Sequence, residues 1–197
     1  MKGITFIILC ISLHISAQIS PNINQYNKQG KKHGIWKGYH ENTQTKRYEG
    51  EFNHGTPIGR FTYYAIEGHV SGIVDFINDS ISSAQMFHDN GSIMAEGKFL
   101  NQTKSGKWYI YSRSGYLLNV LHYLSGALEG TQYSYYPKFD DYEKVKVMEQ
   151  YECTGGLKNG VWKEFHKLGT VKAEGNYFEG NKDCLLYTSP SPRDLRK

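Results

Sequence analysis

Hydrophobic and polar residues alternate along short stretches of this chain. In residues 93–99, Ile, Ala, Gly and Phe occupy every second position, and Met94, Glu96 and Lys98 stand between them. Residues 171–177 repeat the arrangement, with Val, Ala, Gly and Tyr separated by polar residues. Because the side chains of a β-strand point alternately to the two faces of a sheet, the pattern predicts strands with one small and aromatic face and one mostly charged face. It excludes a helix in these segments.

Two series of positions, most of them aromatic, recur together every 23 to 29 residues. The first aromatic series is Trp36, Phe61, Ala84, Trp108, Tyr133 and Trp162. The second aromatic series follows three residues later in each copy and is Tyr39, Tyr64, Phe87, Tyr111, Tyr136 and Phe165. Two residues before the first series, four of the six copies have glycine, and the other two have Ser82 and Thr131. A period shared by several positions indicates internal repeats, of which the third copy, with Ser82 and Ala84, is the least regular.

Each repeat is predicted to be one β-hairpin. Glycine-bearing segments such as Asp89-Asn90-Gly91 follow the second aromatic series, where a positive φ angle favours a tight turn. A second glycine-bearing turn, such as Asn53-His54-Gly55, follows the next strand. We therefore expect an all-β fold over residues 30–182, an elongated antiparallel meander of about six repeated β-hairpins in which each hairpin is stabilised by its neighbours.

Glycine also recurs within the second strand of the repeat, at Gly50, Gly97 and Gly175. Such a glycine weakens an isolated strand, so we expect an aromatic ring from the adjacent strand to lie flat over the bare backbone. The ring is expected to be that of Trp36, Trp108 or Trp162. The second aromatic series is offset by three residues and should face the opposite side of the sheet. It either forms an exposed row suited to a peptide or a sugar, or is buried by sheet curvature, and we favour burial.

The two ends of the chain depart from the repeat. Residues 1–17 combine a basic residue, an apolar run of twelve residues and a small residue, which predicts a signal peptide and an exported protein, periplasmic, outer-surface or secreted. A membrane anchor, the alternative, needs about 20 apolar residues. Residues 18–29 are expected to be a linker. Residues 183–197 abandon the pattern and are interpreted as a non-native tail that replaces native sequence after Lys182, the alternative being a native disordered tail.

Composition and motifs argue against catalysis, cofactors and nucleic-acid binding. The formal net charge is +4 and the only short basic runs are Lys31-Lys32 and Lys46-Arg47, so the electrostatic footprint of a nucleic-acid binder is missing. The eight histidines include no pair at metal-ligand spacing, and Cys153 is the only cysteine outside the two end segments. No nucleophile elbow or phosphate-binding loop occurs. We therefore expect a non-enzymatic protein with no cofactor and no metal ion.

One repeat carries an insertion, residues 137–143. Phe139, Asp140 and Asp141 within it are candidate binding residues, because an insertion confined to one repeat often marks the functional side of a repeat protein. The alternative is a tolerated surface insertion. The two aspartates lack the alternating acidic spacing of a calcium site, so they are not expected to bind a metal.

The best copy of the repeat reads Tyr48-x-Gly50-x-Phe52-x-x-Gly55-x-x-x-Gly59-x-Phe61. In this motif, and in its recurrence over roughly residues 30–182, the chain resembles the MORN repeat and more closely its bacterial variant. The resemblance implies an interaction module, associated with protein scaffolding and also with membranes. Secreted bacterial versions are often labelled antitoxin-like.

The resulting hypothesis is an exported protein-binding or scaffolding module. Its candidate contacts are the second aromatic series, from Tyr39 to Phe165, together with Phe139, Asp140 and Asp141. The alternatives are a cell-surface protein that associates with a membrane or a glycan, and an antitoxin-like partner of a toxin. A near-neutral charge makes anionic lipid the weaker alternative. The open edges of a meander also favour pairing with a second copy, so a homo-oligomer is a further expectation.

Overall fold

The computed structural model describes residues 22–137 and 146–188, with side chains as far as Asp183. The predicted signal peptide, the candidate residues Phe139, Asp140 and Asp141, and most of the predicted non-native tail lie outside the described residues. The described part of the chain contains no helix with the length and hydrophobicity needed to span a bilayer.

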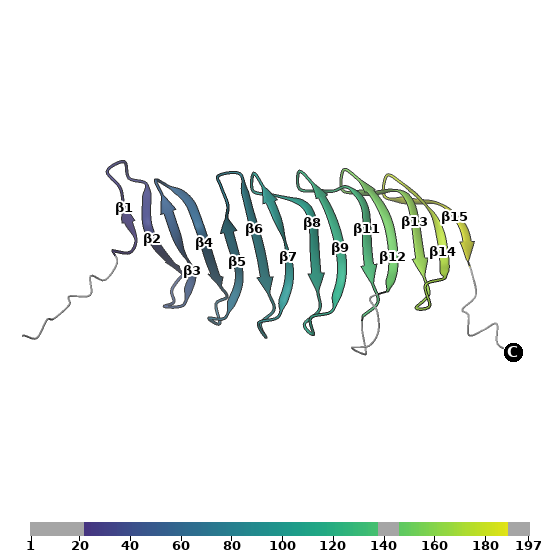
Figure 1. The fold of residues 1–197 in the computed structure, drawn as a ribbon, viewed down its shortest axis with the longest axis horizontal. Coiled ribbons are helices and arrows are strands. Elements are labelled where there is room, and N and C mark those ends of the chain that lie inside the picture. The colour runs from purple at the N-terminus through teal and green to yellow at the C-terminus, as the bar shows by residue number, and fades with distance from the viewer. Residues whose placement is uncertain (1–21, 138–145, 189–197) are drawn as a thin grey trace, which may run out of the picture.

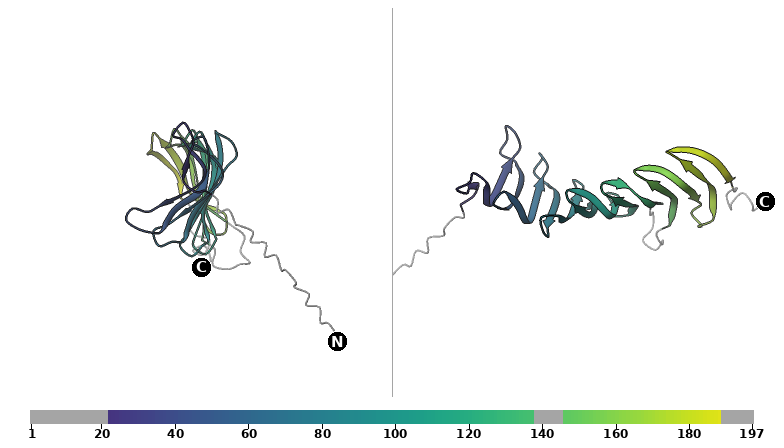
Figure 2. Two further views of the ribbon diagram at one scale, coloured as in Figure 1. Left: turned by 90° about the vertical axis from the view of Figure 1, so that its left-hand side faces the viewer. Right: turned by 90° about the horizontal axis from the view of Figure 1, so that it is seen from above.

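The described residues form a single antiparallel sheet of fifteen strands (Figure 1). The strands are β1 (Gln25–Tyr26), β2 (Lys32–Tyr39), β3 (Lys46–Asn53), β4 (Thr56–Tyr64), β5 (Val70–Phe76), β6 (Ile81–Phe87), β7 (Ile93–Leu100), β8 (Thr103–Tyr111), β9 (Leu117–Leu124), β10 (Ala127–Leu128), β11 (Gly130–Tyr135), β12 (Val147–Thr154), β13 (Leu157–Phe165), β14 (Val171–Phe178) and β15 (Asn181–Thr188). Apart from the short β10, which pairs with β9, the strands lie side by side in sequence order. Seen from above, this single layer twists along its length (Figure 2).

Six hairpins make up most of the sheet, and they confirm the predicted all-β meander. They are β2–β3, β4–β5, β6–β7, β8–β9, β11–β12 and β13–β14. The following strand, β15, pairs with β14 as far as Thr188, so the first residues of the segment 183–197 continue the sheet. The non-native origin of that segment stays a prediction.

The two faces of the sheet differ in chemistry, as the alternation predicts. Phe61, Val74 and Ala84 pair across neighbouring strands on what we call the aromatic face. The residues directly before or after them in sequence, such as Arg60 and Asp75, lie on the opposite, polar face. Ion pairs on the polar face join Lys37 with Glu49, Arg60 with Asp75, and Lys163 with Glu174. Five members of the first aromatic series are buried on the aromatic face: Trp36, Phe61, Ala84, Trp108 and Trp162.

The ring of Trp108 covers the bare backbone of Gly97, as predicted. A Cβ atom added to Gly97 would overlap the indole, with the Cγ atom of Trp108 only 2.6 Å away. The indole is completely buried, and its Nε1 donates a hydrogen bond to the carbonyl of Lys98 (3.1 Å). At Gly50 the covering ring is Phe61 and not Trp36. Phe61 is not among the three tryptophans expected to cover these glycines, because the ring comes in each case from the strand that follows the glycine, β8 or β4.

The fifth hairpin has a different register from the one expected. Gln132, which is fully buried, pairs with Tyr151 on the aromatic face, whereas Tyr133 pairs with Val120 on the polar face. The assignment of Tyr133 to the first aromatic series was therefore wrong, because a buried glutamine occupies that place. Gly130, two residues before Gln132, is then the glycine that precedes the first aromatic series in other copies. It has a positive φ angle (72°), as Gly34 and Gly106 have in their copies.

The same shift of one residue moves Tyr136 out of the second aromatic series. Each second-series residue follows a register shift in its strand, such as the one between Ile110 and Tyr111, and in the fifth copy the shift lies between Ser134 and Tyr135. Tyr135 therefore holds the equivalent place. The residue directly after the second-series place forms a hydrogen bond to the following hairpin. In the first copy, His40 Nε2 donates to the carbonyl of Tyr64 (2.9 Å), and in the fifth copy the Tyr136 hydroxyl donates to the carbonyl of Phe165 (2.6 Å).

The side chain of Gln132 joins β11 to β9 where the strands are poorly paired. Only two residue pairs, Tyr133 with Val120 and Ser134 with Asn119, connect these strands. Beyond them, Gln132 Oε1 accepts a hydrogen bond from the backbone amide of His122 (2.7 Å), and its Nε2 donates to carbonyls of Gly130 (3.0 Å) and Glu129 (3.1 Å). The glutamine thus replaces the backbone hydrogen bonds that the sheet lacks there.

Gly97→Ala is expected to lower the free energy of unfolding by about 2 kcal/mol or more, because the new methyl group displaces the buried Trp108 ring. Chemical denaturation measures the change. Gly72→Ala is the matched control, since a Cβ there would meet only the Gln85 carbonyl oxygen at 3.4 Å. Equal losses for the two variants would contradict the ring-over-glycine contact.

Gln132→Ala is expected to cost about 3 kcal/mol, because it leaves buried backbone groups of β9 without partners and opens a cavity. Gln150→Ala, on the polar face of the next strand, should change stability by less than about 1 kcal/mol. Urea denaturation of both variants provides the comparison. If Gln132→Ala behaves like the Gln150 variant, the glutamine does not support the β9–β11 contact.

Candidate functional site

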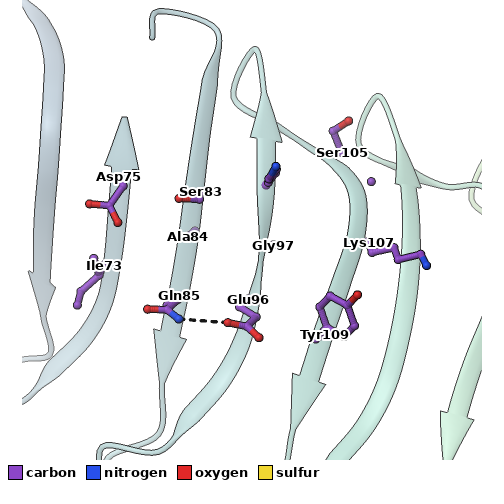
Figure 3. A pocket seen from close by; sticks show the side chains of 12 residues that line it. Ile73, Asp75, Ser83, Ala84, Gln85, Glu96, Gly97, Ser105, Lys107 and Tyr109 are labelled. Carbon is purple, nitrogen blue, oxygen red and sulfur yellow. Dashed lines mark hydrogen bonds between the residues drawn. The ribbon is translucent and has the colours of Figure 1, made fainter. Parts of the chain in front are cut away.

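A groove of about 640 Å³ lies on the polar face over β5, β6, β7 and β8 (Figure 3). We call it the central groove and define it by Asp75, Ser83, Gln85, Glu96, Lys98, Lys107 and Tyr109. Figure 3 shows Asp75, Ser83, Glu96 and Lys107 on four neighbouring strands. The groove therefore spans the second strand of one hairpin, a whole hairpin, and the first strand of the next.

The groove exists because the third copy of the repeat has small residues. On the polar face, directly before the first aromatic series, four other copies have Ile35, Arg60, Lys107 and Val161, the fifth has Thr131, and the third has Ser83, the smallest of the six. Sequence reasoning treated this copy only as degenerate. The signal that could have revealed the groove was the loss of bulk at successive positions of one repeat.

Both carboxylates of the groove are engaged within the protein. Asp75 accepts hydrogen bonds from Nε (2.8 Å) and Nη2 (3.0 Å) of Arg60, and these bonds hold the pKa of Asp75 below its usual value. Glu96 accepts hydrogen bonds from Gln85 Nε2 (3.1 Å) and from the hydroxyl of Tyr111 (2.8 Å). Burial, followed by the hydrogen bond to Glu96, raises the pKa of Tyr111 from 10.0 to about 12.

The two lysines of the groove lack such partners among the residues that the structure describes. Lys98 and Lys107 are exposed, and neither ammonium group forms an ion pair within the part of the chain that the structure describes. The hydroxyls of Ser83, Ser105 and Tyr109 lie in the same lining. This arrangement offers positive charge and hydrogen-bond donors to a ligand. Among the described residues, no three His, Cys, Asp or Glu side chains are grouped so that they could hold a metal ion.

The second aromatic series lies on the polar face, and only some of its members contact residues of the central groove. Tyr111 reaches the groove through Glu96. The Tyr64 hydroxyl is engaged by Lys46 (3.3 Å), and Phe87 and Phe165 are half-buried. Tyr39 is the most exposed of these residues, at 47%. The series is therefore mostly packed against its own sheet, and a binding role for its members stays a prediction.

The aromatic face carries a feature that sequence reasoning missed, a lysine four residues before each tryptophan of the first series. Lys32 and Lys104 lie over the rings of Trp36 (4.5 Å to the ring centroid) and Trp108 (4.6 Å). Lys158 lies over Tyr151 (4.0 Å). Such contacts between a cation and an aromatic face each contribute about 0.5–1 kcal/mol when exposed. The motif Lys-x-Gly-x-Trp, present three times, was the available signal.

Residues 158–179 match the family model described as MORN repeat variant. The chain carries a MORN variant repeat. The match covers the hairpin β13–β14 and confirms the resemblance drawn from the repeated motif. MORN repeats are generally modules that bind proteins or membranes. A comparison of the chain with curated proteins found no match.

Tyr111→Phe is expected to reduce the amount of folding stability that the protein loses at alkaline pH. Because the folded state holds the Tyr111 proton more tightly than the unfolded chain, its stabilisation is complete below the unfolded pKa of 10.0 and is lost as the pH rises toward about 12. Unfolding free energies measured across this interval should fall less steeply for Tyr111→Phe than for the parent chain. Tyr39→Phe, in the exposed member of the series, serves as the control. Identical slopes for all three proteins would contradict the raised pKa.

Proposed function

We propose that this protein is a non-enzymatic MORN-type repeat module that binds a partner protein through the central groove. The observation that carries the proposal is an open groove across four strands whose lysines and hydroxyls have no partners within the described chain. A repeat sheet presents an extended surface of this kind to a partner better than it encloses a small molecule. The general role of MORN repeats in binding proteins or membranes supports the same conclusion.

An exported location is part of the proposal. The signal-peptide pattern of residues 1–17 supports a periplasmic, outer-surface or secreted protein. A scaffolding role and an antitoxin-like role are both consistent with a module that binds a protein. They differ in the partner, which is a structural protein in one case and a toxin in the other.

The aromatic face favours a second candidate function, association with a membrane surface. Half-buried rings such as Tyr48, Phe52 and Tyr123 lie beside Lys32 and Lys104 on that face. Aromatic residues with lysines are typical of membrane interfaces. Binding to lipid vesicles in the absence of any protein partner would favour this candidate over the groove.

The test of the groove is Ser83→Arg, which fills it with the residue that the second copy already has at the equivalent place, Arg60. Because that copy accommodates the arginine, the fold should be retained. Capture of the partner from an extract of the source organism, with the full chain as bait, should weaken by about tenfold or more. The amount of each captured protein is measured by quantitative mass spectrometry.

Val161→Arg is the matched control, since Val161 occupies the same place in the sixth copy and lies outside the groove. It adds the same side chain and the same charge to the polar face. A partner lost with Ser83→Arg and retained with Val161→Arg supports the proposal. A partner retained by both variants, or lost from both, would falsify it.

A further inference from the structure

We infer that the central groove binds an acidic segment of polypeptide in an extended conformation. The inference rests on the proposed function and names the chemistry of the partner at that site. It follows from a difference between the acidic and the basic side chains of the groove: the carboxylates accept hydrogen bonds from other residues of the protein, whereas the two lysines form no ion pair among the described residues.

Both carboxylates of the groove have partners within the protein. Asp75 forms an ion pair with two nitrogens of Arg60, whereas Glu96 keeps its charge and accepts hydrogen bonds from the neutral side chains of Gln85 and Tyr111. A basic ligand would have to displace Arg60 from Asp75 or take these hydrogen bonds from Glu96. The groove therefore disfavours a cationic partner.

The positive charges of the groove remain available. Lys98 on β7 and Lys107 on β8 are exposed and form no ion pair among the described residues. Their strands are hydrogen-bonded neighbours, with Lys98 opposite Ser105 and Lys107 two residues further along. Both lysines stand on the polar face of adjacent strands, so a carboxylate of a ligand lying across these strands is attracted by both charges. The hydroxyls of Ser83, Ser105 and Tyr109 add neutral donors beside them.

The lysines of the aromatic face do not offer the same site. Lys32 donates a hydrogen bond to the Tyr48 hydroxyl (2.9 Å) and lies over three rings. Lys158 forms an ion pair with Glu149 (3.1 Å). On the central strands, the ammonium group of Lys104 likewise lies over the rings of Trp108 (4.6 Å) and Tyr123 (5.0 Å). The lysines of the aromatic face therefore contact groups of the protein itself, unlike Lys98 and Lys107.

The dimensions of the groove suit an extended segment. Four adjacent strands span about 14 Å at the usual spacing between strands, which corresponds to about four residues of extended chain. Such a segment crosses the strands and passes both lysines. Because the groove is open to solvent, charge complementarity is expected to contribute to selectivity and to the association rate.

The experiment uses the full chain and three capped peptides of about eight residues, in which serine alternates with glutamate, glutamine or lysine. Fluorescence anisotropy measures the binding of each labelled peptide. The glutamate peptide is expected to bind at least about tenfold more tightly than the other two, and its binding should weaken as ionic strength rises. Equal binding of the three peptides, or none, overturns the inference.

Two double variants with the same change of charge show where the peptide binds. The double variant Lys98→Glu, Lys107→Glu should weaken the binding of the glutamate peptide by about tenfold or more. The double variant Lys28→Glu, Lys31→Glu, near the first strand, should leave that binding unchanged. Equal weakening by both pairs overturns the site. A natural partner that is lost with Ser83→Arg but retained with Lys98→Glu and Lys107→Glu would leave the groove as the binding site and overturn only the acidic chemistry.

Discussion

A sheet without a second layer has to bury its apolar surface against itself, and contact between an aromatic ring and a bare glycine backbone makes this possible. Trp108 lies on Gly97, and Phe61 lies on Gly50. Burying a large side chain stabilises a protein by about 1.5–3 kcal/mol, and in this fold each such gain depends on the neighbouring hairpin. No hairpin therefore has a core of its own. The stability of the protein is distributed along the row of repeats, as in other quasi-linear repeat proteins.

The same dependence explains why a change in one copy has consequences in the next. Ala84 replaces a ring in the third copy, and Trp108 of the fourth copy becomes the centre of the cluster that contains Ala84 and Ala95. On the polar face, the loss of bulk at Ser83 leaves the central groove between β5 and β8. The aromatic face thus keeps a packed centre while the polar face gains a hollow. A repeat that is poor in consensus residues becomes the place where the surface differs from that of its neighbours.

The fifth copy shows how the sheet accommodates a polar residue in a position normally occupied by a ring. Gln132 cannot contribute an aromatic contact, but its amide bonds the backbone on both sides of the poorly paired seam between β9 and β11. A buried amide is tolerated only when its donors and acceptor are satisfied, and here they are satisfied by backbone groups. Hydrogen bonds from His88 to the carbonyl of Tyr111 and from Tyr136 to that of Phe165 join neighbouring hairpins on the two sides of this seam.

The repeat length, the hairpins and the two unlike faces could be predicted from the sequence, because period and alternation depend only on local residue order. An aromatic ring over the recurring strand glycine was predicted as well, but the strand that supplies the ring was not, since Phe61 lies over Gly50. The register of the fifth copy was not predictable in this way, because two adjacent residues, Gln132 and Tyr133, both fit the period and only pairing with β9 and β12 distinguishes them. The central groove and its lysines, which form no ion pair among the described residues, also required the tertiary structure. Empty space and free charge are properties of neighbouring strands taken together, and no single stretch of sequence contains them.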